Sequence, residues 1–187
     1  GIGASLVAKI KNTKTPFGID FGVGDIIVPR QEKRKIPTQL DDFTSPTVNT
    51  YSLETTIAEK LDAILDLMEF SSRMKDYYDI YYLANKFDFD GATLAEALKK
   101  TFENRGHKFT VEQFEQVMAF GSDDAMQKKW KAFYRKIDTK TDDYGTVLKT
   151  IKAFLTEPFT AEIDNRGFFG RWSANQNEWI IGGSYNG

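Results

Sequence analysis

The amino-acid sequence predicts an α+β protein, in which a β-rich segment precedes a mostly α-helical domain. Residues 16–25, PFGIDFGVGD, alternate between apolar residues and glycine or aspartate, which is the period of a strand with one apolar face. From Ser52 onwards, apolar residues recur instead at helical spacing. We therefore divide the chain into a β-rich part at 1–50, a helical domain at 51–158 and a C-terminal arm or hairpin at 159–187.

Composition excludes several classes of site. The chain has 41% hydrophobic and 28% charged residues and a net charge of -2, which suits a globular protein and does not indicate a strongly basic nucleic-acid surface. It has no cysteine and one histidine, His107, which excludes disulfides, thiolate chemistry and a multi-histidine zinc site within this chain. No apolar run approaches the roughly 20 residues that span a bilayer, so we expect a cytoplasmic protein without membrane contact.

The first 50 residues are expected to form strands separated by turns. A short strand at 5–10 precedes a polar turn, and a second strand at 18–28 is predicted to end at Pro29. Residues 30–35 read as a charged, solvated loop. Two prolines make the following stretch, up to residue 50, extended or irregular.

Asp20 is the one carboxylate on the glycine-lined face of the second strand. The opposite face of this strand, which includes Phe17 and Phe21, is apolar and is expected to pack on a core. Glycine within a strand often marks a close approach by a ligand or by another backbone. Asp20 is therefore a candidate ligand for a hard cation such as Mg²⁺, which prefers oxygen donors. The alternative is an aspartate that faces solvent on an edge strand.

The helical domain is predicted to begin at Ser52, a suitable N-cap, with Glu54 in the first turn. A second helix is expected at about 72–86. Further amphipathic segments are bounded by N-cap residues and by Gly or Pro, and they predict helices at 93–106, 111–121, 122–137 and 143–158. Aromatic residues at helical spacing are expected in the core, namely Phe102, Phe114, Phe120, Trp130, Phe133 and Phe154.

Lys60 lies at the flank of the apolar stripe of the first helix, roughly 80° from its centre at 100° per residue. A lysine there can bury its methylenes and present its ammonium to a site beside the core, where it would act as a point charge for phosphate. The alternative is a surface lysine paired with Glu59 or Asp62.

Asp76 and Asp79 are three residues apart in SRMKDYYDIYYL and so share one helix face, beside apolar residues. Buried charges need partners, and functional sites are places where such arrangements gather. The two aspartates are expected either to line a site or to form a structural network, with Arg73 as the nearest cation.

In these stretches the sequence resembles the abortive-infection nucleotidyltransferase toxins of the AbiEii/AbiGii family. The likeness is carried by GIDFGVGD (18–25), YSLETTIAEKLDAIL (51–65) and SRMKDYYDIYYL (72–83), and more loosely by TLAEALKKTFENRG (93–106). It covers roughly residues 15–106. Beyond residue 106 the expectation depends on helical pattern alone.

The resemblance implies a nucleotidyltransferase-like mixed sheet followed by a helical domain, in the toxin of a toxin–antitoxin or phage-defence pair. It implies Mg²⁺-dependent transfer of a nucleotide from a nucleoside triphosphate (NTP) to an RNA acceptor such as tRNA, and a cognate antitoxin as partner. It assigns metal binding to Asp20 and catalysis to Lys60 and Asp76. It assigns nucleotide binding to Lys60, Arg73, Lys75 and Asp79.

The chain departs from the family in lacking its strongest mark, a Gly-Ser turn followed by a D-x-D or D-x-E strand. GIGAS at 1–5 contains Gly and Ser, but no acidic pair follows at a useful spacing. We therefore expect the sequence to begin after the main metal ligands, so that its sheet is partial and this polypeptide is inactive alone.

Two readings without chemistry remain open. In the first, the helices after residue 90 form a protein-interaction module and the aspartates are structural. In the second, KKWKAFYRK at 128–136 binds RNA, because it interleaves cations with aromatic residues; the ordinary alternative there is a solvated basic helix face. His107 is expected to be a loop residue without a catalytic part.

Overall fold

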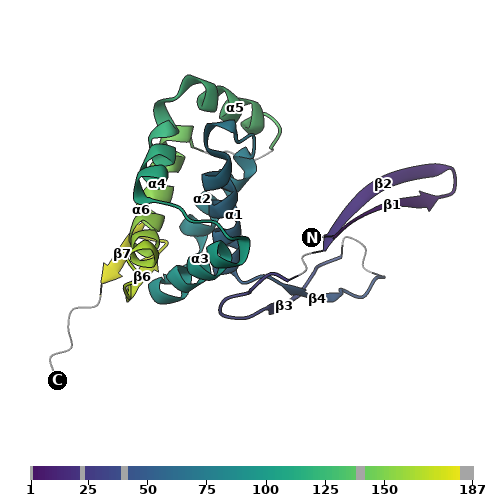
Figure 1. Ribbon diagram of the computed structural model, residues 1–187. Helices are drawn as coiled ribbons and strands as arrows, with labels where there is room; N and C mark the ends of the chain where they lie inside the picture. Colours follow the sequence, from purple (N-terminus) through teal and green to yellow (C-terminus); the bar gives the residue numbers. More distant parts are fainter. Residues whose placement is uncertain (1, 22–23, 39–41, 138–141, 182–187) are drawn as a thin grey trace.

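The computed structural model describes residues 2–21, 24–38, 42–137 and 142–181 (Figure 1). Within these ranges the α-helices are α1 Leu53–Leu67, α2 Met74–Lys86, α3 Gly91–Arg105, α4 Val111–Met118, α5 Asp124–Tyr134 and α6 Tyr144–Ile163. Short 3₁₀ turns follow α1 and α4, at Met68–Phe70 and Ala119–Ser122. The strands are β1 Ile2–Ile10, β2 Thr13–Phe21, β3 Glu32–Lys35, β4 Thr47–Thr50, β5 Phe89–Asp90, β6 Gly170–Ser173 and β7 Glu178–Ile181.

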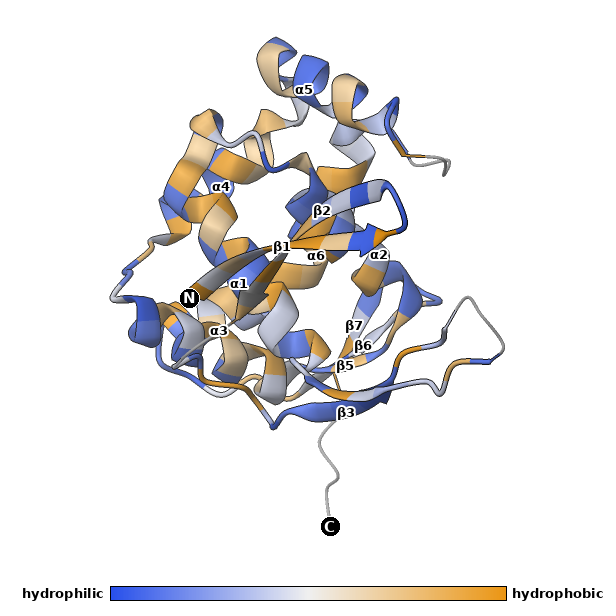
Figure 2. Ribbon diagram, turned by 90° about the vertical axis from the view of Figure 1, so that its right-hand side faces the viewer, coloured by the Kyte–Doolittle hydropathy of each residue, from blue (hydrophilic) through white to orange (hydrophobic). Residues whose placement is uncertain are grey.

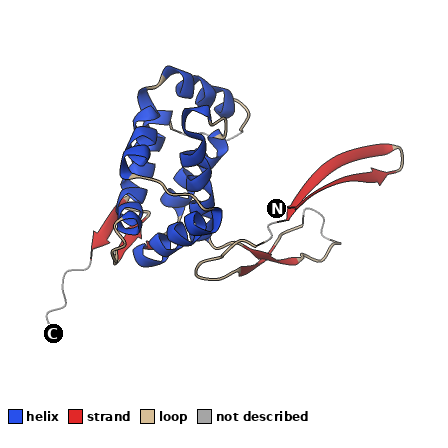
Figure 3. Ribbon diagram, viewed as in Figure 1, coloured by secondary structure: helices blue, strands red, loops and turns tan. Residues whose placement is uncertain are grey.

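The strands pair antiparallel in three small sheets, β1–β2, β3–β4 and β5–β6–β7 (Figure 3). Together with the helical body they confirm the predicted α+β class. In place of one mixed sheet, the described part of residues 1–50 forms two separate strand pairs. The β1–β2 hairpin extends away from the helices in Figure 1.

The apolar face of the β1–β2 hairpin does not pack on the helical core, contrary to expectation. Leu6 pairs with Phe17 and Ile2 with Phe21, so the apolar residues of both strands share one face. These residues are exposed, Phe21 by 51%, and hydrophobic residues are drawn in orange on the hairpin in Figure 2. The alternating pattern therefore predicted an extended strand with an apolar face, but neither its bounds nor the exposure of that face.

The second strand ends at Phe21 and does not continue to Pro29 as expected. Gly24 has a φ of +82°, in the left-handed region that favours glycine and that interrupts an extended strand. Further along, Val28 leaves the strand path and docks on the start of α1: its N–H donates to Thr55 Oγ1 at 2.9 Å, and its carbonyl accepts from Ser52 Oγ. The β-rich segment is thus attached to the helices through the N-terminus of α1.

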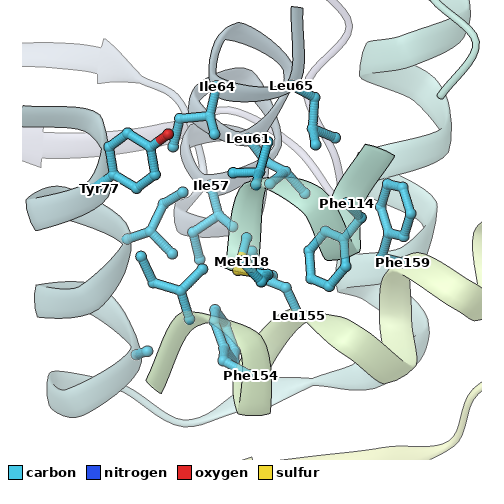
Figure 4. Packing of buried hydrophobic residues seen from close by; sticks show 14 of the residues in the cluster. Ile57, Leu61, Ile64, Leu65, Tyr77, Phe114, Met118, Phe154, Leu155 and Phe159 are labelled. Carbon is cyan, nitrogen blue, oxygen red and sulfur yellow. The ribbon is translucent and has the colours of Figure 1, made fainter. Parts of the chain in front are cut away.

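The start of α1 is the one predicted, with Ser52 as N-cap accepting a hydrogen bond from Thr55 N at 3.1 Å. The helix buries its apolar stripe in one continuous core. Figure 4 shows Ile57 and Leu61 of α1 lying among side chains that include Met118 and Leu155. Of the aromatic residues expected in this core, Phe102, Phe114, Trp130 and Phe154 are buried, and Phe120 and Phe133 pack against it half-buried.

Helix α6 continues past Pro158 to Ile163, whereas the proline was expected to end it. Proline lacks the N–H that would bond to the carbonyl of Phe154, four residues earlier. Trp179 supplies the missing donor, since its indole N–H donates to Phe154 O at 2.9 Å. The C-terminal sheet therefore compensates for the break in the helix.

Two tryptophans hold this C-terminal sheet on the helical body. Trp172 of β6 pairs with Trp179 of β7 in the strand register, and its indole N–H donates to the carbonyl of Ala84 in α2 at 2.7 Å. Residues 170–181 therefore form a hairpin, extended by β5, while residues 159–163 belong to α6.

Candidate active site

Helix α1 positions Lys60 at the edge of the buried stripe. Its neighbours Ile57, Leu61 and Ile64 are buried, whereas the Lys60 side chain keeps 18% of its surface exposed. Its Nζ lies 3.1 Å from Asp76 Oδ1 and 2.6 Å from Asp79 Oδ2, both on α2. The lysine thus points from one helix at the two aspartates of the next.

The α2 side of the cluster comes from the R-x-K-D-x-x-D stretch. Asp76 is only 4% exposed and also accepts from Arg73 Nε at 2.5 Å. Asp79 also accepts from Lys75 Nζ at 2.6 Å. The structure therefore brings Lys60, Arg73, Lys75, Asp76 and Asp79 together, and the roles expected of them stay predictions.

The pKa of Lys60 is raised. Burial opposes its charge and would lower the pKa, but hydrogen bonds from Lys60 to Asp79 and Asp76 outweigh that cost. Lys60 is therefore a permanent ammonium at neutral pH. It interacts with an incoming group as a fixed positive charge, without titrating.

The cluster combines three cations with two carboxylates in a half-buried setting. An anion with several negative oxygens, such as a triphosphate, can replace the carboxylates as the partner of these cations. A lysine ammonium offers three hydrogen-bond donors and a guanidinium offers five. A carboxylate released in this way becomes a proton acceptor beside the bound anion. The arrangement suits phosphoryl chemistry that depends on positioning and charge stabilisation.

A magnesium ion does not fit these residues as they stand. Both oxygens of Asp76 are held by Lys60 and Arg73, and Asp79 Oδ2 is shared by Lys60 and Lys75. Across the described residues, no group of three or more His, Asp or Glu side chains is placed to hold a metal. The described cluster thus presents more cations than carboxylates, which suits an anion better than a metal ion.

Asp20, the expected metal ligand, lies on β2 opposite Gly3. Its side chain falls outside the part of the chain that the structure describes. Strand β2 belongs to the hairpin that extends from the helical body (Figure 1), so its backbone is not brought to the Lys60 cluster. The predicted metal role of Asp20 stays a prediction.

A second charged cluster lies on another face of α1, and the sequence analysis missed it. Glu59 and Asp62 were considered as partners of Lys60, but Glu59 instead accepts from Arg105 at the end of α3. Asp62 Oδ1 lies 2.8 Å from Nδ1 of His107, and its Oδ2 lies 3.3 Å from Arg105 Nη1. The i, i+3 spacing of Glu59 and Asp62 was visible in the sequence. Their partners were not, because Arg105 and His107 lie more than 40 residues further along the chain.

Burial raises the pKa of both carboxyl groups in this second cluster. It raises the pKa of Asp62, whose side chain is 1% exposed, although His107 and Arg105 act in the opposite direction. Burial likewise raises the pKa of Glu59 against the effect of Arg105. His107 is a loop residue, as expected, and it ties the loop after α3 to α1.

Helix α5 carries the basic stretch that was considered for RNA binding. Lys129 donates to the backbone carbonyls of Glu69 and Ser71, at 2.8 and 3.0 Å, so it anchors α5 on the connection between α1 and α2. Trp130 is buried and cannot stack on a ligand from outside. Lys128 and Arg135 remain exposed.

The α+β fold brings lysine, arginine and aspartate side chains of α1 and α2 into one cluster. Residues 2–157 match the family described as nucleotidyl transferase AbiEii toxin, type IV toxin–antitoxin system, and the chain belongs to this family. No curated protein and no solved structure matches it. The match extends the predicted resemblance, at roughly 15–106, across most of the helical domain.

None of the helices in the described residues has both the length and the apolar character needed to cross a bilayer.

Proposed function

We propose that the Lys60 cluster binds the triphosphate of an NTP and that the protein transfers the nucleotide to the end of an RNA, such as tRNA. The observation that carries this proposal is the convergence of Lys60 from α1 on Asp76 and Asp79 of α2. Membership of a nucleotidyltransferase toxin family supports the reaction class. In the cell we expect a cytoplasmic toxin in phage defence, restrained by a cognate antitoxin.

In the proposed reaction an RNA hydroxyl oxygen attacks the α-phosphorus of the NTP. The new P–O bond forms as the bond between the α-phosphorus and the bridging oxygen breaks, and pyrophosphate leaves. Lys60, with Arg73 and Lys75, offsets the charge that grows on the pyrophosphate. Asp76, freed from its ion pairs by the triphosphate, accepts the proton of the hydroxyl.

We expect Mg²⁺ to enter with the NTP, because this ion is usually held by one or two carboxylates together with substrate phosphates. When bound, it would neutralise phosphate charge. As the family resemblance implies, Asp20 is the proposed protein ligand of this ion, although the β1–β2 hairpin does not bring the β2 backbone to the Lys60 cluster in this structure.

The test uses the protein translated from its complete gene, beside the 187-residue chain. Each is incubated with Mg²⁺, one labelled NTP at a time and total tRNA. Label on RNA with the unaltered protein, and its loss in Lys60→Ala, is the expected result. Lys100→Ala is the matched control, because Lys100 forms an exposed pair with Glu103 on α3.

Two outcomes would overturn the proposal. One is the absence of label with every NTP from the complete-gene protein, when circular dichroism shows that it is folded; the 187-residue chain alone is expected to give no label. The other is full activity in folded Lys60→Ala. Either result would favour the second candidate, a helical interaction module, in which the pairing of each cation with an aspartate is purely structural.

A further inference from the structure

A hollow of about 350 Å³ lies between α5 and the start of α6. It is lined by Gln127, Trp130, Lys131, Tyr134, Asp142, Asp143 and Tyr144. Its volume falls in the range of small-molecule sites, roughly 300–1,000 Å³. Its lining includes none of the residues of the Lys60 cluster, and no step of the proposed reaction uses it.

Aromatic rings form the walls of this hollow. The rings of Trp130 and Tyr144 are 5.5 Å apart and tilted by 33°, and the indole N–H of Trp130 is held by the carbonyl of Asp142 at 3.1 Å. Tyr134 stands at the rim and is 38% exposed. Trp130 and Tyr144 are buried, so Tyr134 is the ring of this lining that can stack on a planar aromatic ligand.

Positive charge lies along α5 and reaches the hollow at Lys131. Lys128, Lys131 and Arg135 follow i, i+3, i+7 spacing and therefore share one helix face. All three are exposed and take part in no ion pair formed by the described residues. The acid at this face is Asp124, in the first helical turn. Lys131 belongs both to this stripe and to the lining of the hollow.

Two exposed aspartates also belong to the lining of the hollow. Asp142 accepts a hydrogen bond from Tyr81 on α2, and Asp143 caps α6 by accepting from Thr146. These carboxylates disfavour a phosphate in the interior. They can still accept hydrogen bonds from an exocyclic amino group, as Asp and Glu do from cytosine. The charges therefore favour a base inside and phosphates outside.

Helix α5 also lies close to the Lys60 cluster. Lys129 holds α5 against Ser71, and the Ser71 hydroxyl accepts from Arg73 N at 3.2 Å, directly before the aspartates of α2. Figure 1 shows α5 at the end of the helical body opposite the C-terminal sheet. A strand bound along α5 is thus led towards the start of α2.

We propose that this hollow binds one amino-bearing base of a single-stranded RNA, while Lys128, Lys131 and Arg135 hold the adjoining phosphates. The inference rests on the proposed function only in taking RNA as the acceptor. The base stacks on Tyr134 at the rim, and adenine or cytosine is preferred over uracil because uracil has no amino group.

The test measures fluorescence anisotropy of labelled eight-nucleotide oligo(A), oligo(C) and oligo(U), without NTP, over a range of salt concentrations. We expect oligo(A) and oligo(C) to bind tighter than oligo(U). Tyr134→Ala should weaken oligo(A) binding by roughly 5- to 100-fold and remove the base preference, since stacking contributes about 1–3 kcal/mol per base. Tyr134→Phe keeps the ring and should therefore retain both the oligo(A) affinity and the base preference.

The phosphate contacts have their own readout. Replacing Lys128, Lys131 and Arg135 with Ala should weaken all three oligonucleotides alike and reduce the slope of log K against log salt by about 2, at roughly 0.7 per contact. Lys149→Ala on α6 and Tyr82→Ala on α2 are matched exposed controls and should change neither quantity.

Equal binding of oligo(U), or a folded Tyr134→Ala variant that binds like Tyr82→Ala, would overturn the inference. A Tyr134→Phe variant that loses as much affinity as Tyr134→Ala would overturn it as well. Because no NTP is present, the outcome is separate from the transfer reaction: base-selective binding without nucleotide transfer would support this site and refute the proposed catalysis.

Discussion

Lys60 of α1 and Asp76 of α2 form an ion pair with an N···O distance of 3.1 Å across sixteen residues of sequence. The same ammonium lies 2.6 Å from Asp79. The pair joins the two helices that carry the family resemblance, and it places a fixed positive charge at their junction. It has consequences for stability that can be measured independently of activity.

Lys60→Met keeps the apolar stem and removes the charge. We expect the free energy of unfolding to fall by about 1–3 kcal/mol, because a buried aspartate loses a charged donor. Urea denaturation measures this change. Lys100→Met, which breaks an exposed pair with Glu103, should cost no more than about 1 kcal/mol. Equal costs for the two variants would show that the Lys60 pairing does not stabilise the fold.

The raised pKa of Glu59 leads us to expect that the stability of the fold depends on pH. Its pKa is raised in the folded state, chiefly by burial, so folding favours the protonated form. Its contribution to stability is therefore fully present below the unfolded pKa and is lost as the pH rises through the folded pKa. The stability of the wild type relative to Glu59→Gln should decrease as the pH rises from 4 to 7.

Urea denaturation at unit pH intervals tests the Glu59 prediction. Glu115→Gln is the control, since Glu115 is an exposed acid paired with Lys152. A difference between wild type and Glu59→Gln that is constant with pH, or that grows as the pH rises, would contradict it.

We expect substitutions of Trp179 and Pro158 to have coupled effects on the free energy of unfolding. Trp179→Phe removes the donor to Phe154 O and should lower the free energy of unfolding by about 1–3 kcal/mol. Pro158→Ala restores a backbone N–H that can bond to the same carbonyl. The double variant should therefore lose less stability than the sum of the single variants, and thermal and urea unfolding of all four proteins measures the coupling. Strict additivity would refute the compensation.

Lys129 is expected to act as a structural residue of α5 and not as an RNA ligand. Lys129→Met removes the bonds to the carbonyls of Glu69 and Ser71 and should cost about 1–3 kcal/mol of stability. The salt dependence of oligonucleotide binding should stay that of the wild type. Lys131→Met should reduce the salt dependence of oligonucleotide binding and leave stability close to that of the wild type. An identical effect of both substitutions on the salt dependence would contradict the assignment.

The helical part of the site could be predicted from the sequence because its residues are encoded locally. Ser52 caps α1, the stripe around Leu61 sets which way Lys60 points, and the three-residue spacing puts Asp76 and Asp79 on one face. Caps and helical periodicity depend on neighbours within four residues. That range is the one in which sequence patterns are informative.

The partners of these residues could not be predicted in the same way. Nothing in the sequence around Asp62 indicates that His107 and Arg105 would bind it in place of Lys60. The alternation at 16–25 indicates an apolar face on β2, but not that this face lies away from the helical core. Both outcomes depend on segments that are distant in sequence.

The sequence by itself determined the α+β class, the start of α1, the family resemblance and the residues of the helical cluster, because each follows from short-range periodicity, capping or motif. The tertiary structure decided that α6 passes Pro158, that Lys129 anchors α5 and that an aromatic hollow lies beside a basic stripe. Buried polar groups must find partners wherever the fold brings them. Their identity is therefore set by packing between distant segments and not by local pattern.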